Sequence, residues 1–343
     1  MRRIALSAAL IGLLSASLMA QTSKNWELRP DRSWEEINRS APQPEADPDL
    51  NRAQTMLIQG KFDSAKKILF RWVKNPATRA HPQRDRALLL TAEALFQYGD
   101  RIKSFYYCDQ LLDEYPDSRY YAVALQKQYE IGDAFLDGYK LRFMKIPFLD
   151  AVEYGVELMF RIQQRSPGSE LAERALLRTA DHYFNDAQYD LSSDAYASYI
   201  KAYPRSPVIP RVRLQRAYSS YAQFRGVRYD VTPLLEARSQ FLDLESEYPQ
   251  LAAEHNLSSL VERIDQAFAQ KIAWTADFYR RTSQPRAAVY QYRFLALTYP
   301  ESTEAKTASA QLARMPEKYL SEPAPRAGTG YAPTTVPTEE VSQ

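Results

Sequence analysis

The residues that could carry chemistry are few in this chain and stand far apart. Its 343 residues include three histidines, His81, His182 and His255, and one cysteine, Cys108. A metal site needs ligands at short spacings such as His-Glu-x-x-His, and none of the histidines has one. Cys108 falls where a helix is expected to be buried, which disfavours a reactive thiolate. With no phosphate loop and no nucleophile elbow either, the sequence predicts no catalytic residue, no metal, no cofactor and no enzymatic activity.

Side chains suited to binding a peptide recur at two places. Charged, aromatic and amide residues stand 30, 23, 20 and 19 residues before Pro116 and again before Pro204. The two rows are Arg86, Glu93, Phe96 and Gln97, and Arg174, Asp181, Phe184 and Asn185. In a stack of helix pairs, such first-helix positions tend to face the concave surface, where an extended peptide could bind. The alternative is that both rows are merely solvated helix faces.

The elements that would position these rows end in a repeated motif. Tyrosine or serine followed by proline recurs at Pro116, Pro167, Pro204, Pro249 and Pro300, and in four cases a serine stands two residues after the proline. Proline cannot continue a helix, and the serine can cap the next one through its side-chain oxygen. The motif therefore predicts the end of one helix and the start of another.

Side-chain size alternates at fixed distances before these prolines. The residues 24, 21, 12 and 8 places earlier are Ala276, Tyr279, Ala288 and Tyr292 before Pro300, Ala180, Tyr183, Ser192 and Tyr196 before Pro204, and Ala92, Leu95, Ser104 and Cys108 before Pro116. An earlier unit shows Ala53, Met56, Ala65 and Leu69. Small residues let two helices cross closely, and large ones fill the gaps between them. We predict an all-α fold, a tetratricopeptide-like solenoid of helix pairs with about six to seven repeats and roughly 13 helices.

Two repeats depart from this pattern. Before Pro249 only the second helix fits, with Ala237 and Phe241, because the segment 225–230 breaks the first helix. Before Pro167 the second helix carries Gly155 and Met159, and the segment 138–147 interrupts what precedes it. We expect these irregular repeats to bend the stack.

Composition restricts the class of partner. With 44 basic and 42 acidic residues, the formal net charge is only +2. No strong single-sign field is available to attract a polyanion, so we expect no nucleic-acid partner.

The first twenty residues have the features of a secretory signal peptide. Arg2 and Arg3 precede an apolar run over 4–14 that is too short to span a bilayer, and small residues follow up to Ala20. We expect cleavage near Ala20 and export. A short membrane anchor or an ordinary core helix remains the alternative.

Motifs in about half of the chain, from about 148 to 315, point to a known family. They are ADHYF at 180–184, SYIKAYPRSP at 198–207, GVRYD at 226–230, ADFYRR at 276–281 and YPES at 299–302. In order and spacing this stretch resembles the BamD family of outer-membrane β-barrel assembly factors. We therefore divide the chain into a signal peptide (1–20), a disordered N-terminal arm (21–47), N-terminal repeats (48–140), BamD-like repeats (141–315) and a disordered C-terminal tail (316–343).

The resemblance implies a periplasmic scaffold for the assembly and insertion of outer-membrane β-barrel proteins. Its partners would be a barrel-inserting outer-membrane protein and unfolded barrel substrates, with Arg293 as the candidate for docking on the former. Family members are usually lipoproteins, whereas no cysteine lies near Ala20. We therefore expect a peripheral protein at the outer membrane that associates with it through partners.

Two other functions fit the same fold. One is a periplasmic adaptor for cell division or peptidoglycan synthesis. The other is a helical-solenoid transglycosylase, which needs an added compact catalytic domain, and the polar flanks are too short to form one.

Overall fold

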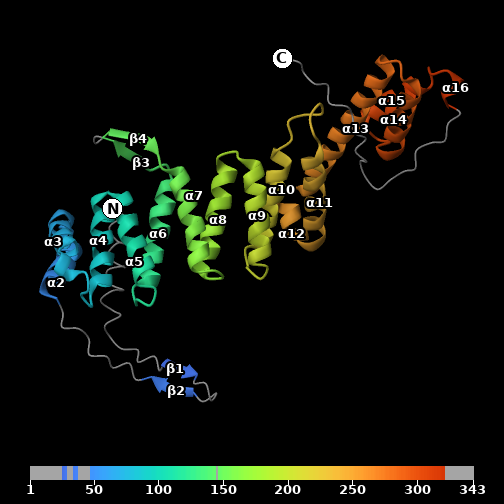
Figure 1. Cartoon of the computed structure of the whole chain (residues 1–343). Helices are drawn as coiled ribbons and strands as arrows, with labels where there is room; N and C mark the ends of the chain where they lie inside the picture. The colour runs from blue at the N-terminus through green and yellow to red at the C-terminus, as the bar shows by residue number, and fades with distance from the viewer. Residues whose placement is uncertain (1–24, 29–33, 38–46, 144–145, 321–343) are drawn as a thin grey trace. The chain divides into compact units, whose positions relative to one another are not determined.

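The computed structural model describes residues 25–28, 34–37, 47–143 and 146–320 (Figure 1). The signal peptide predicted at 1–20 and its cleavage site lie outside the described residues. The chain divides into two compact units, 1–165 and 166–343. Both are helical, as predicted. The described residues contain fifteen α-helices, α2 to α16, of which α12 and α16 have only six and four residues.

Unit 1 is a row of antiparallel helices, each packed on the next in the chain (Figure 1). They are α2 (Pro48–Ile58), α3 (Phe62–Lys74), α4 (Arg84–Tyr98), α5 (Arg101–Glu114), α6 (Tyr121–Leu136) and α7 (Val152–Arg165), with a short 3-10 helix η1 (Pro76–Thr78). Helix α4 also contacts α2 and α6. Contacts between a helix and its second neighbour are what stacked helix pairs require, because each pair buries its apolar stripe against the next.

Unit 2 continues with helix pairs. Its helices are α8 (Glu170–Asn185), α9 (Tyr189–Ala202), α10 (Ile209–Ala222), α11 (Thr232–Glu247), α12 (Pro249–Glu254), α13 (Leu257–Arg281), α14 (Pro285–Thr298), α15 (Thr303–Leu312) and α16 (Glu317–Leu320). The break predicted at 225–230 separates α10 from α11. Lys271 of α13 holds this loop, since its Nζ donates to the Tyr229 carbonyl at 3.2 Å.

The alternation of small and large side chains is present in the core. The small positions Ala53, Ala65, Ala92, Ser104, Ala180, Ser192, Ala276 and Ala288 are all fully buried. At the close crossings Ser104 Oγ donates to the Ala92 carbonyl at 2.7 Å, and Ser192 Oγ to that of Ala180 at 3.4 Å. The second-helix knobs Leu69, Cys108, Tyr196 and Tyr292 are buried as well. Small residues thus set the distance between paired helices.

The serines after the prolines act in two ways. Ser169 and Ser302 are N-caps, and each accepts a hydrogen bond from the backbone amide three residues later. Ser118 and Ser206 do not cap, because the next helices begin only at Tyr121 and Ile209. Ser118 Oγ donates to Asp85 at 2.6 Å instead, and so ties the turn to α4.

The fold is all-α as predicted, and it contains in addition short strands that were not predicted. In unit 1, β3 (Lys140–Phe143) pairs antiparallel with β4 (Ile146–Asp150) between α6 and α7, where the sequence showed only an interruption. In the arm expected to be disordered, β1 (Asn25–Leu28) pairs with β2 (Trp34–Ile37). The alternation of apolar and polar residues in Asn-Trp-Glu-Leu favours a strand, and single short runs of this kind are easily overlooked. At the other end, α16 falls within the tail expected to be disordered.

Candidate functional site

The first predicted row lies on α4, and three of its members join a network with α6 around a buried lysine. Lys127, whose side chain is 3% exposed, has its Nζ 2.8 Å from Glu93 and 2.5 Å from Glu130. Gln97 donates to Glu93 at 2.8 Å, and the Phe96 ring lies 4.5 Å from Lys127 Nζ. Burial alone would lower the pKa of Lys127, but the two glutamates outweigh it and raise that pKa. These side chains connect neighbouring helices.

Arg86, the fourth member, reaches toward the preceding helix. Its Nη2 donates to Asn51 Oδ1 at 2.8 Å and to Gln54 Oε1 at 2.6 Å, both on α2. Like the Lys127 network, this contact ties one helix pair to the next. The first row therefore contributes to stacking within unit 1, and its role in binding a peptide stays a prediction.

The second row lies on α8 in unit 2, and its members differ in exposure. Asp181 accepts from Tyr196 at 2.6 Å and from Arg211 at 3.1 Å. Phe184 packs on the core cluster around Tyr196, with its ring 5.7 Å from that of Tyr189. Arg174 and Asn185 are exposed. The first row belongs to unit 1 and the second to unit 2, so each is described within its own unit.

Arg293, the predicted docking residue, is half-buried on α14. Its Nη2 donates to the Leu320 carbonyl at 2.5 Å, at the end of α16. Arginine thus donates to the carbonyl of the last residue of a helix, a contact that basic side chains often make. This intramolecular contact was not foreseen, and docking through Arg293 also stays a prediction.

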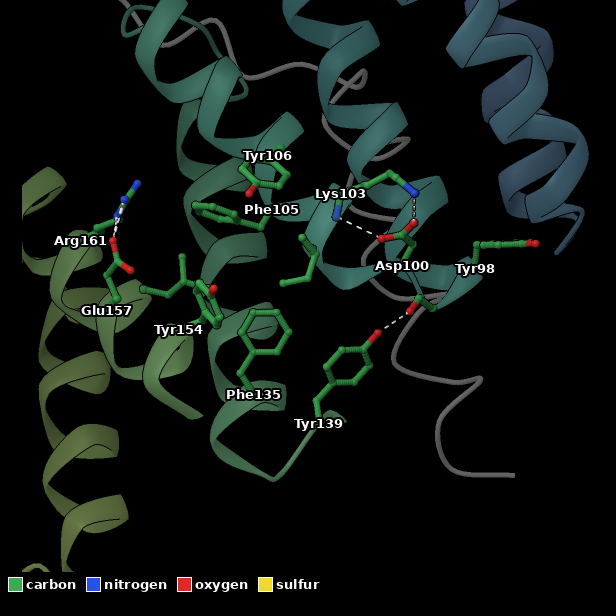
Figure 2. A pocket seen from close by; sticks show the side chains of 13 residues that line it. Tyr98, Asp100, Lys103, Phe105, Tyr106, Phe135, Tyr139, Tyr154, Glu157 and Arg161 are labelled. Atoms are coloured by element: carbon green, nitrogen blue, oxygen red, sulfur yellow. Dashed lines mark hydrogen bonds and ion pairs between the residues drawn. The ribbon is translucent and has the colours of Figure 1, made fainter. Parts of the chain in front are cut away.

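A pocket that the sequence did not reveal lies in unit 1. Its volume is about 580 Å³, and it is lined by residues of α4, α5, α6 and α7 and of the turns after α4 and α6 (Figure 2). Phe135 and Leu158 are almost fully buried in its wall, whereas Tyr106 and Tyr154 are 62% and 53% exposed. The pocket combines an apolar interior with aromatic rings that face solvent, which is typical of ligand sites.

Tight turns bring these residues together. Gly99 ends α4 with a φ of +95°, a conformation that glycine adopts without strain, and Asp100 then caps α5 by accepting from the Lys103 amide at 3.2 Å. Tyr139, just after α6, donates its hydroxyl proton to the Gly99 carbonyl at 2.8 Å. This hydrogen bond connects the end of α6 to the turn between α4 and α5.

Charged pairs lie on two sides of the pocket. Figure 2 shows the Asp100–Lys103 pair on the α5 side and the Glu157–Arg161 pair on the α7 side. Their separations are 2.6 Å and 2.7 Å, and Arg161 also lies 3.3 Å from Asp109. The four groups sum to no net charge.

Cys108 is fully buried on α5. Burial raises the pKa of the Cys108 thiol. His182 is buried in the last turn of α8, and His255 follows the last residue of α12. Among the described residues no cluster of metal-ligating side chains occurs, and no helix there is both long and apolar enough to cross a bilayer.

Comparisons with solved structures return helical repeat proteins. One is the C-terminal part of a TPR repeat-containing protein from Cytophaga hutchinsonii, with 14% identity over 76% of this chain and 86% of that one, at a TM-score of 0.36. Another is a thermophilic TPR protein from Thermus thermophilus, with 14% identity, 63% and 96% coverage and a TM-score of 0.28. A third is PilW, a type IV pilus biogenesis factor, with 16% identity, 77% and 100% coverage and a TM-score of 0.28.

The sequence itself matches a protein family over about half of its length. No curated protein matches the chain. The family model YfiO, described as outer membrane lipoprotein, matches residues 152–325, from the start of α7 to beyond α16. The resemblance to BamD, noted from the motifs between 180 and 302, is thereby confirmed. Because the match covers half of the sequence, this chain belongs to the YfiO family of outer membrane lipoproteins.

Proposed function

We propose that this protein is a non-enzymatic periplasmic adaptor in the assembly and insertion of outer-membrane β-barrel proteins. The observation that carries the proposal is the family match over residues 152–325, which coincides with a stack of helix pairs. Such repeats present broad surfaces of side chains and typically bind other proteins.

The proposed partners are a barrel-inserting outer-membrane protein and unfolded barrel chains. On α8 the exposed residues Arg174 and Asn185 are the members of the predicted rows best placed to meet a partner. Export and a peripheral position at the outer membrane, through partners, complete the proposal. They rest on the sequence features of residues 1–20 and on the family.

Depletion tests the proposed function. If the protein assists barrel assembly, its controlled depletion lowers the amount of folded β-barrel proteins in isolated outer membranes, and expression of the full chain restores them. Folded barrels are measured by their heat-modifiable migration in gels. Unchanged barrel levels after complete depletion would exclude this function.

Affinity purification from native envelopes identifies the partner directly. We expect the full chain to recover a barrel-inserting outer-membrane protein, and the variant with Arg174→Ala and Asn185→Ala to recover less of it. An exposed pair elsewhere, Lys67→Ala with Glu254→Ala, is the control. Recovery of division or wall-synthesis proteins, without a barrel-inserting protein, would favour the adaptor role in those processes instead.

A further inference from the structure

The pocket of unit 1 lies at the ends of helices and is compact. Tyr98 is the last residue of α4, and Asp100 caps α5, whose first turns carry Ile102 to Tyr106. Phe135 stands near the end of α6, and Tyr154 to Arg161 lie in the first ten residues of α7. The predicted peptide rows, in contrast, extend along the first helices. A volume of about 580 Å³ is within the range of sites for small ligands. The pocket therefore suits one compact group, including a single unit of a longer chain, better than an extended peptide.

The charged side chains that line the pocket favour an uncharged ligand. Each charged side chain of the lining lies against a partner of opposite sign, Asp100 with Lys103 and Glu157 with Arg161. A charged ligand would meet a like charge in either pair. Groups that both donate and accept hydrogen bonds can bond to both members of a pair. Hydroxyl and amide groups have this property.

The aromatic side chains argue for a ligand with flat apolar faces. Tyr106 and Tyr154 expose more than half of their surface, while one face of Tyr98 is occupied by Lys66, whose Nζ lies 3.1 Å from the ring centre. A pyranose ring presents C–H groups that pack on a tyrosine face and a hydroxyl edge that bonds to neighbouring polar groups. An N-acetyl group adds a methyl that can enter the apolar interior formed by Phe135 and Leu158.

From these features we propose that the pocket binds N-acetylglucosamine units, which are the uncharged sugars of the cell-wall glycan strand. Tyr106 and Tyr154 stack on sugar rings, and the Asp100–Lys103 and Glu157–Arg161 pairs bond to hydroxyl and amide groups. This site would attach the protein to the cell wall. The proposal is independent of a role in barrel assembly.

Binding to a defined oligosaccharide tests the proposal. The full chain is titrated with the β-1,4-linked tetramer of N-acetylglucosamine in a calorimeter. The variants are Tyr106→Ala and Tyr154→Ala, and Tyr290→Ala on α14 is the control, since Tyr290 is also exposed but lies in unit 2. We expect Kd to rise about tenfold in each pocket variant and to stay unchanged in the control. Circular dichroism verifies that all variants fold.

A second measurement identifies the source of the sugar. Purified cell-wall sacculi should sediment the full chain and the Tyr290→Ala control, and much less of the variant with both pocket substitutions. No binding of the tetramer at millimolar concentration, or equal binding by all variants, would overturn the proposal. So would a preference for lipopolysaccharide, or for uncharged aromatic peptides, over the tetramer and the sacculi.

Discussion

At the scale of single residues, a tyrosine–carboxylate hydrogen bond recurs at one position of the repeat. Tyr196 donates to Asp181 at 2.6 Å, and Tyr292 to Asp277 at 2.7 Å, in both cases across fifteen residues. In the repeat that ends at Pro116, Cys108 replaces the tyrosine, and Lys127 of the next helix pairs with the acid, Glu93. The first helix of each of these three pairs therefore carries an acidic residue at the same position. Its partner is a tyrosine in two pairs and a lysine in the third.

The variant Tyr292→Phe measures the value of this bond. It keeps the ring that fills the core and removes the hydroxyl, so Asp277 loses one donor. We expect the free energy of unfolding in urea at pH 7 to fall by about 1 kcal/mol. Tyr290→Phe, at an exposed site on the same helix, should change it little.

The same tyrosine makes stability depend on pH. Burial, and then the bond to Asp277, raises the pKa of Tyr292 to about 12, from an ordinary value of 10.0. Its contribution is therefore fully present below pH 10 and is lost as the pH rises toward 12, because the unfolded chain ionises first. The wild-type protein should lose more stability over this interval than Tyr292→Phe. Equal losses would contradict the assignment.

Cys108 permits a chemical test of burial. Its side chain is fully buried, and burial raises the pKa of its thiol, so little thiolate is available for reaction. We expect negligible labelling by a thiol reagent at pH 8 in the native protein and labelling of one thiol per chain in denaturant. Rapid labelling of the native protein would show that α5 opens readily.

At the scale of elements, two glycines determine how closely α6 and α7 approach. A Cβ atom on Gly155 would lie 3.0 Å from the Gly132 carbonyl oxygen and equally close to the Leu136 side chain. Backbone atoms cannot move away cheaply, so the close approach requires glycine. Gly155 occupies the small position twelve residues before Pro167 that the sequence pattern identified.

The variant Gly155→Ala should therefore destabilise the protein. In an unhindered helix alanine is better than glycine by about 0.5–1 kcal/mol, but overpacking costs about 1–3 kcal/mol. We expect the melting temperature to fall, and oligosaccharide binding to weaken, since α6 and α7 form part of the pocket. Gln164→Ala, exposed on the same helix, is the control. A melting temperature higher than that of the control would contradict the close approach.

Helix pairs were predictable because their signals are local. Proline cannot continue a helix beyond its first turn, so it marks a boundary between helices. The small residue of each crossing, such as Ala180 or Ala276, follows from its distance to that proline. The β3–β4 hairpin was not predictable, because its short strands interrupt the repeat pattern without an alternation long enough to identify them. The 25-residue length of α13 was also missed, because its first half lies outside the repeat.

At the scale of the whole molecule, the candidate sites were harder to predict than the fold. The distance in sequence to the next proline places Glu93 and Asp181 correctly on the first helices of their pairs. It does not indicate that Lys127 pairs with Glu93, or Arg211 with Asp181. The pocket depends on four helix ends and two turns that are distant in sequence. Tyr106 and Tyr154 fall outside the spaced core positions, so the repeat pattern assigns them no role.

The division into two units leads to a prediction about folding. The core clusters around Tyr196, Phe241 and Tyr292 contain only residues of unit 2, so each of these clusters is formed within the unit. We expect a fragment of residues 166–320 to be helical and to unfold cooperatively on its own. A fragment of residues 189–320 lacks α8, which supplies Leu176 and Ala180 to the first of these clusters, and should melt at a lower temperature and over a broader range. Thermal unfolding of both fragments is followed by circular dichroism. An unfolded 166–320 fragment would mean that unit 2 depends on the helices that precede it.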